Sequence, residues 1–221
     1  MPAPLNTASR DAILTPIPEL HLAAQLLDAA VTAILIDRMA LAAQLLEQAH
    51  IPAIMDYAKR AVGSMSVEVH RIVKRPACLP RAERHPTRMP NTGLQQSIFM
   101  RDGWRCRFCG TKVICKAART VLIKAFPTET RWGSKEFERH AALYALASSL
   151  DHVVPHGRGG KNEQANFVTA CYCCQFGRGE WTLEESALTD PRLRAPLCDG
   201  WDGLSRLVKH AERMNRITVQ G

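Results

Sequence analysis

The chain has 221 residues, of which 46% are hydrophobic and 23% charged, a composition typical of a globular protein rather than a disordered or fibrous one. Its net charge of +8 is uneven: residues 1–63 carry −2, so the remainder carries +10, which favours a polyanionic partner. No stretch reaches the roughly 18 to 20 uncharged apolar residues that a membrane span needs, so no membrane anchor is expected.

The N-terminal segment MPAPLNTASRD has no basic region followed by an apolar core, so it does not resemble a secretory signal. We therefore expect a cytoplasmic location. Because that compartment is reducing, the eight cysteines are not expected to form a disulfide framework, and closely spaced pairs among them indicate metal binding instead.

Residues 18–63 are predicted to be helical, because Ala, Leu and Gln dominate and apolar residues recur at helical spacing. Two or three helices fit this length. The hexamer LAAQLL at residues 22–27 recurs at residues 41–46, which suggests that two similar helix faces pack as a hairpin. Pro52 suits the first turn of a new helix and Gly63 its C-terminal end. We expect this unit to be a scaffold or a homodimer surface.

Residues 64–95 are predicted to be an extended basic linker. Four prolines alternate with six basic residues, which is typical of a segment without regular secondary structure (Pro76, Pro80, Pro86 and Pro90; Arg71, Lys74, Arg75, Arg81, Arg84 and Arg88). The wider stretch 71–119 holds twelve basic residues and two acidic ones. The linker could follow a phosphate backbone or simply join two domains, and both alternatives stay open.

Two C-x2-C pairs follow, and together they predict a zinc site. Such a turn lets two sulfurs approach one ion, and two turns supply the four thiolates of a closed tetrahedral site (Cys106, Cys109, Cys171 and Cys174). Because a closed site leaves no open position for water, this Zn²⁺ is expected to be structural. The other four cysteines are expected to be a bystander (Cys173) or small buried residues (Cys78, Cys115 and Cys198).

Between the two pairs runs the segment SLDHVVPHGRGGKNEQANFVTAC. Here the chain resembles the HNH endonuclease family, whose signature has DHxxP, RGG, N and CxxC in this order. The residues that match are Asp151, His152, Pro155, Arg158, Gly159, Gly160, Asn166, Cys171 and Cys174. The resemblance covers residues 97–181. It implies a ββα-metal core that hydrolyses DNA phosphodiester bonds with one divalent metal ion.

Asp151 and His152 are the expected centre of the chemistry. A divalent ion bound by Asp151, Mg²⁺ or Mn²⁺, would neutralise a phosphate oxygen and the charge that develops on the leaving 3′ oxygen. Neighbours on a strand point to opposite sides, so Asp151 can hold the metal while His152 meets the attacking water. An imidazole with an ordinary pKa of about 6.5 suits proton abstraction from that water. The resemblance likewise makes His152 the general base, and His140 and His156 are not assigned to the site.

Asn166 matches the middle position of the signature, where the side chain bonds the loop and orients the general base. Gln175 stands where the family normally has a His or Asn as the second protein ligand of the catalytic metal. Its amide oxygen is a hard ligand, but the extra methylene displaces that oxygen and adds a rotatable bond. Arg158, Lys161 and Arg178 flank the site and are expected to contact backbone phosphates.

Helix signals outside the signature predict further elements around the core. A helix is expected from about residue 135 to 147. In the tail, Thr182 with Glu185 matches a capping box, and SRLVKHAERM from Ser205 is typical of an amphipathic helix. We expect the helical tail to pack on the core.

The sequence therefore predicts an α+β chain with four parts: a helical N-terminal unit (1–63), a basic Pro-rich linker (64–95), a zinc-stapled HNH nuclease core (96–181) and a helical tail (182–221). The expected function is DNA cleavage. Gln175 favours an alternative, a zinc-stabilised DNA-binding module that cuts weakly or not at all. A third class is a helical partner-binding protein on a zinc scaffold. Restriction, phage defence, mobile-element mobility and DNA repair are all compatible roles.

Overall fold

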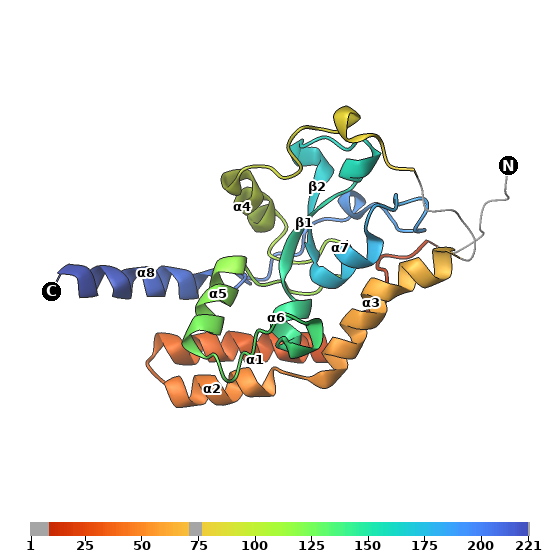
Figure 1. The fold of residues 1–221 in the computed structure, drawn as a ribbon. Helices are drawn as coiled ribbons and strands as arrows, with labels where there is room; N and C mark the ends of the chain where they lie inside the picture. Colours follow the sequence, from red (N-terminus) through yellow and green to blue (C-terminus); the bar gives the residue numbers. More distant parts are fainter. Residues whose placement is uncertain (1–8, 71–76, 221) are drawn as a thin grey trace.

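The computed structural model describes residues 9–70 and 77–220 and has an α+β architecture, as predicted (Figure 1). The described N-terminal part holds α1 (Pro18–Leu35), α2 (Met39–Gln48) and α3 (Pro52–His70). The two LAAQLL hexamers bury the same two positions, Ala23 and Leu27 on α1 and Ala42 and Leu46 on α2. Small alanines let α1 and α2 lie side by side, which confirms the predicted hairpin.

The third helix is longer than predicted. It continues through Gly63 to His70, so the expected helix end at Gly63 is wrong. Gly lowers helix stability by about 1 kcal/mol relative to Ala but does not by itself end a helix. α3 packs on α7 (Tyr172–Arg178), where Gly177 allows close approach, because a Cβ there would lie 2.6 Å from the carbonyl oxygen of Ala61.

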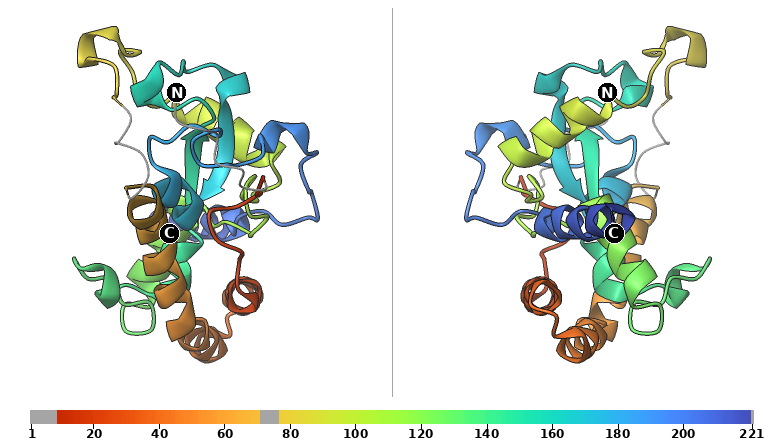
Figure 2. Two further views of the ribbon diagram at one scale, coloured as in Figure 1. Left: turned by 90° about the vertical axis from the view of Figure 1, so that its right-hand side faces the viewer. Right: turned by 90° about the vertical axis from the view of Figure 1, so that its left-hand side faces the viewer.

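A two-stranded antiparallel sheet forms the centre of the molecule. It consists of β1 (Ser148–His152) and β2 (Phe167–Cys171), with Asp151 opposite Val168 and His152 opposite Phe167. α7 follows β2 directly, with Cys171 as its N-cap. α4 (Thr92–Arg101) lies on the other side of the sheet from α7 (Figure 2). A continuous apolar core joins these elements to the N-terminal helices.

The segment between the two cysteine pairs contains α5 (Lys116–Ala125), which the sequence reasoning missed, and α6 (Ala141–Ala145). The helix expected from about residue 135 to 147 is wrong in length: a single 3₁₀ turn (Glu136–Glu138) precedes the short α6. The reason lies in His140. Its backbone is extended and its Nδ1 accepts a hydrogen bond from the N–H of Leu143, so His140 caps α6 instead of lying inside a longer helix.

Residues 77–91, which fall in the predicted linker, are ordered against the core. Leu79 donates its N–H to the carbonyl oxygen of Gly157 at 2.8 Å, and a 3₁₀ turn (Arg81–Glu83) follows. We call residues 77–90 the strap, since Figure 1 shows this segment (yellow) passing over the end of the sheet where β1 finishes. Part of the predicted linker, residues 71–76, lies outside the described residues.

The tail forms α8 (Ser205–Gln220), as predicted, and it packs on α5 and α1. The capping-box hydrogen bonds between Thr182 and Glu185 are present at 2.9 and 3.1 Å, but they close a turn and no helix follows. Two short 3₁₀ turns border the sheet (His156–Arg158 and Gln164–Asn166), and a third lies in the tail (Pro191–Leu193). Among the described helices, none combines the length and apolarity needed to cross a bilayer.

Candidate functional site

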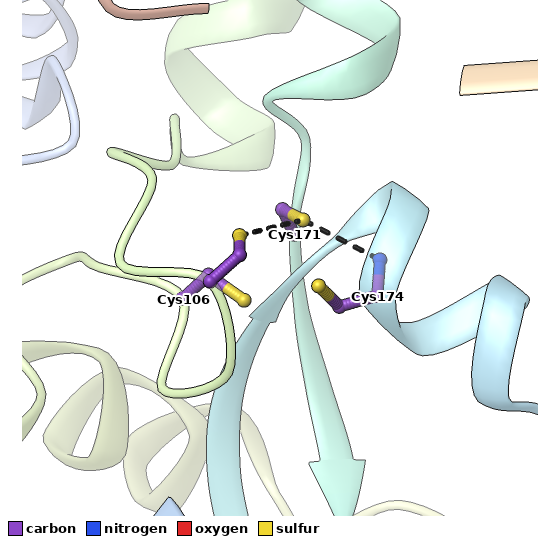
Figure 3. Close-up of side chains that lie close together, drawn as sticks. Cys106, Cys171 and Cys174 are labelled. Carbon is purple, nitrogen blue, oxygen red and sulfur yellow. Dashed lines mark hydrogen bonds between the residues drawn. The ribbon is translucent and has the colours of Figure 1, made fainter. Parts of the chain in front are cut away.

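The four predicted cysteines meet at one point, between the loop after α4, the end of β2 and the first turn of α7. The ligand sulfurs of Cys106, Cys109, Cys171 and Cys174 all lie within 4.8 Å of one another, and Figure 3 shows sulfurs from the loop facing those of the second pair. The Sγ atoms of Cys109 and Cys171 are 3.7 Å apart. A tetrahedral site with Zn–S bonds of about 2.3 Å needs sulfurs about 3.8 Å apart. The group could therefore bind a structural zinc ion.

Backbone hydrogen bonds shape both halves of this group. In the first, Cys106 N–H donates to the Thr111 carbonyl at 2.9 Å and Gly110 N–H donates to the Cys106 carbonyl at 2.8 Å, which closes a tight turn. In the second, the N–H of Cys174 donates to the Cys171 sulfur at 3.4 Å, so Cys171 caps the first turn of α7.

The remaining cysteines lie outside the group. Cys173 and Cys115 are buried and Cys78 is half-buried. Cys198 is exposed, so its predicted burial is wrong. It follows Pro196 in an irregular segment of the tail, where no helix or strand covers it.

A small cleft of about 70 Å³ lies at the end of β1, beneath the strap. Three of the predicted site residues line it, Asp151 and His152 from β1 and Gln175 from α7. The other lining residues were not assigned to the site from the sequence: Arg88, Met89, Leu150, Pro155, His156, Phe176, Gly179 and Glu180. Asp151 and His152 are both buried. The expected convergence of these side chains on one cleft is therefore possible in this fold.

The hydrogen bonds of His152 fix its tautomer. Its Nε2 lies 2.9 Å from Asn162 Oδ1, and the amide of Asn162 is oriented because its Nδ2 donates to the carbonyl oxygen of Thr87 in the strap. An acceptor at Nε2 means that Nε2 carries the proton and that Nδ1 keeps its lone pair. In the described part of the chain, no hydrogen-bond partner occupies Nδ1. Burial lowers the pKa of His152 below its ordinary value of 6.5, which favours the neutral, basic form.

Asn166 closes the loop that follows His152. Its Oδ1 accepts from the N–H of Val154 at 2.8 Å, and its Nδ2 donates to the carbonyl oxygens of Val154 and Lys161 at 3.1 and 3.0 Å. This is the kind of loop contact expected from the sequence. Its effect on His152 is indirect, since the backbone carbonyl of Asn166 accepts from Val153, the next residue along the chain.

This closed loop leads to a prediction for Gly160. A methyl group there would lie 1.8 Å from the Val154 carbonyl oxygen and 2.9 Å from Asn166 Nδ2. Gly160→Ala should therefore open the loop and cost about 2–3 kcal/mol, which lowers the melting temperature by roughly 5–10 °C. Gly93→Ala is the control, because among the described residues its added methyl would meet only Oδ1 of Asn91, at an ordinary contact distance of 3.5 Å. Equal melting temperatures for both variants in a thermal scan would contradict the prediction.

Asp151 forms a buried ion pair with Arg178. The guanidinium donates through Nε and Nη2 to the two carboxylate oxygens at 3.1 and 2.7 Å, and through Nη1 to the Trp181 carbonyl at 2.8 Å. Burial raises the pKa of Asp151, and the charge of Arg178 opposes that rise. Each carboxylate offers about four lone-pair sites, so this pair leaves sites for another ligand.

The three residues expected from the sequence to contact phosphates differ in their placement. Arg178 is 1% exposed and faces Asp151, so in this conformation it cannot meet a phosphate as expected, because its donors are spent inside the protein. Arg158 is half-buried and pairs with Glu185 at 2.7 Å. The Lys161 side chain is 73% exposed, and its Nζ lies 3.8 Å from the carboxylate of Glu163 in a surface ion pair that solvent screens. Arg88 of the strap, also exposed, lines the cleft.

Gln175 presents an unsatisfied oxygen. Its Nε2 donates to the Leu150 carbonyl at 3.1 Å, while its Oε1 is buried without any hydrogen-bond partner. A buried carbonyl oxygen without a partner costs free energy, and a bound cation or water would remove that cost. Glu180, which the sequence reasoning missed, adds a second carboxylate to the cleft, held by the N–H of Gly157 at 3.1 Å. Its only sequence signal is its place five residues after Gln175.

The cysteine group is the one set of three or more His, Cys, Asp or Glu ligands close enough to hold a metal within the residues that the structure describes. Comparison of the chain with protein-family models, with curated proteins and with solved structures gave no match. The resemblance to the HNH family therefore stays a prediction that rests on the residues of this chain.

Proposed function

We propose that this protein is a divalent-metal-dependent DNA endonuclease of the HNH type, with His152 as general base. One observation carries the proposal most: the side chain of His152 is held in a single tautomer, with a free Nδ1, in the same cleft as the carboxylate of Asp151. A buried histidine with a purely structural role usually has both ring nitrogens hydrogen-bonded within the protein, whereas His152 has a partner only at Nε2 in the part of the chain that the structure describes. The four-cysteine group, at the opposite end of the sheet from His152, supports the rigid placement of β2 and α7.

The oxygen donors of the cleft suit Mg²⁺ or Mn²⁺. Asp151 and the partnerless Oε1 of Gln175 would hold the ion, and Glu180, which lines the same cleft, would add a second carboxylate. The bound ion would polarise the phosphate and neutralise the leaving oxygen. Gln175 would supply a hard oxygen as the second ligand, in place of the His or Asn of the family.

His152 would remove a proton from the attacking water at Nδ1. The resulting imidazolium keeps its Nε2–H bonded to Asn162, so the ring does not rotate as it gains charge. Attack on phosphorus then breaks the bond to the 3′ oxygen. Arg88 and Lys161 are the exposed cations that would hold the neighbouring phosphates.

The alternative is a DNA-binding module without cleavage. The ion pair between Asp151 and Arg178 favours it, since a carboxylate already neutralised by a guanidinium attracts a metal less strongly. Supercoiled plasmid separates the two functions. An endonuclease yields nicked or linear DNA with Mg²⁺ or Mn²⁺ and none when the ion is omitted. A binding module retards the plasmid in a gel and leaves it intact with every ion.

The role of Gln175 as a ligand predicts opposite effects of two substitutions. Gln175→Leu removes the oxygen donor and should raise the Mn²⁺ concentration for half-maximal nicking roughly 10- to 100-fold, the usual range for loss of a metal-supporting group. Gln175→Glu supplies a charged oxygen and should lower that concentration. Both substitutions remove the hydrogen bond from the Gln175 amide nitrogen to the Leu150 carbonyl oxygen. The difference in metal dependence between the two variants therefore measures the contribution of the oxygen ligand. Equal metal dependence of the two variants would refute the assignment.

A further inference from the structure

A groove of about 860 Å³ lies beside the candidate cleft, between α4, α5 and the first turns of α8. Ser148, Ser149 and Leu150 of β1 form its floor, and Figure 1 shows α4 above and α5 with α8 below on the same side of β1. The side chains that matter for its chemistry are uncharged polar groups and two lysines: Gln95 and Gln96 on α4, Ser149 on β1, Lys116 and Thr120 on α5, and Lys209 on α8.

The groove adjoins the cleft. Met89 of the strap and Leu150 of β1 line both hollows. Along β1, residues 148–150 border the groove and residues 150–152 border the cleft. A chain-like ligand whose reacting group lies at Asp151 and His152 would therefore extend along β1 into the groove.

The walls of the groove suit a nucleic-acid strand. Lys116 and Lys209 are exposed and come from different helices, and Glu212 is the single acidic residue among the lining residues. Lys116 also begins α5, so the partial positive charge of that helix end adds to its own. Amide and hydroxyl side chains can form hydrogen bonds to sugars and bases, and the apolar part of the lining, which includes Phe99, Trp104 and Val208, can contact base faces.

The size of the groove favours one strand over two. Its volume lies within the usual range of about 300–1,000 Å³ for sites that enclose a single small ligand, which corresponds to a few nucleotides of one strand. A duplex would have to lie across the rim and would leave the floor at Ser149 unused.

We infer that this groove binds an unpaired DNA strand adjacent to the scissile phosphate, so that the substrate class is DNA with a single-stranded segment. The inference rests on the proposed function, because it assigns the reacting phosphate to the cleft. Lysine–phosphate contacts release counterions, so each contact adds about 0.7 to the magnitude of the slope of log affinity against log salt for single strands.

The test is the binding of a fluorescent single-stranded oligonucleotide, measured by anisotropy at several salt concentrations without divalent ions. The double variant Lys116→Gln/Lys209→Gln should bind more weakly and reduce the magnitude of the slope by about 1.4. Lys124→Gln is the matched control, since Lys124 is an exposed lysine of the same helix α5 that does not line the groove. Its affinity and slope should equal those of the unmodified protein.

The outcomes separate the two proposals. If the unmodified protein nicks DNA but the double variant binds the oligonucleotide with an unchanged slope, the groove inference is overturned and the nuclease proposal stands. If the double variant shows the reduced slope while the unmodified protein never cuts, the groove is supported as a binding surface and the nuclease proposal fails. Tighter binding of a duplex than of a single strand of equal length would overturn the single-strand assignment.

Discussion

His152→Ala is expected to reduce metal-dependent nicking of supercoiled plasmid by about 10²- to 10⁴-fold, the usual contribution of a general base. The loss follows from the free Nδ1 of His152, because His152 comes directly after Asp151 on β1 and its ring lines the same cleft as that carboxylate. His156, whose ring centroid is 5.7 Å away, bonds the carbonyl oxygen of His85 through its Nε2 and so belongs to the attachment of the strap.

The matched control is His156→Ala, which removes an imidazole from the same cleft and should retain most of the activity. Because His152 packs at 4.4 Å from the ring of Phe167, His152→Asn is a second variant that limits the loss of packing. DNA affinity and melting temperature should change little in His152→Asn. Full activity in both His152 variants would show that His152 is not the general base. If activity is lost only in variants that also fail to fold, His152 has a structural role alone.

The parts of the site that were predictable from sequence are those with fixed local spacing. Each C-x2-C pair sets two sulfurs on one turn, so the four-cysteine group followed from chain order alone. Adjacent residues at the end of a strand likewise placed Asp151 and His152 together. Asn166 closes a loop that begins only a few residues after His152, so its contacts are short in sequence as well.

The parts that were not predictable depend on contacts between distant residues. Arg178 was expected to face a phosphate, because a lone arginine near a site is ordinarily exposed. Its burial against Asp151 requires the packing of α7 on β1, which no local pattern encodes. The strap is a second case: Thr87 orients Asn162 through a backbone carbonyl, and any residue type can supply that group. The proline and arginine content of residues 77–90 indicated a linker and did not predict that this segment packs against the loop after β1.

Helix boundaries show the same limit. Gly63 was read as a stop and α3 continues past it, whereas His140 was placed inside a helix and instead caps α6. At Gly63 the local signal was too weak to end the helix, whereas at His140 a tertiary contact decides. The ring of His140 bonds the carbonyl oxygen of Leu46 on α2 at 2.8 Å, which fixes this residue at the junction between the N-terminal helices and the core.

Loss of the zinc site is expected to have the largest effect on stability. Structural zinc contributes roughly 10–16 kcal/mol in small zinc-dependent folds, which equals or exceeds the about 5–15 kcal/mol of net stability of a typical domain. The four cysteines join three segments that otherwise meet over little regular structure, since the sheet has two strands of five residues each. Cys106→Ser should therefore lose bound zinc and the cooperative thermal transition of the core, measured by metal analysis and by circular dichroism during heating.

Two other cysteines provide the controls for this prediction. Cys198→Ser removes an exposed thiol and should leave zinc content and melting unchanged, while Cys173→Ala changes a buried neighbour of the group and should keep the zinc at a small cost in stability. A purified protein without zinc, or a Cys106→Ser variant that melts like the unmodified chain, would contradict a structural metal. Such a result would also remove the support for the cleft, because Cys171 and Cys174 set the start of α7 and hence the place of Gln175. Re-addition of Mg²⁺ or Mn²⁺ should restore nicking after removal of the catalytic ion alone, but not after the zinc has been stripped.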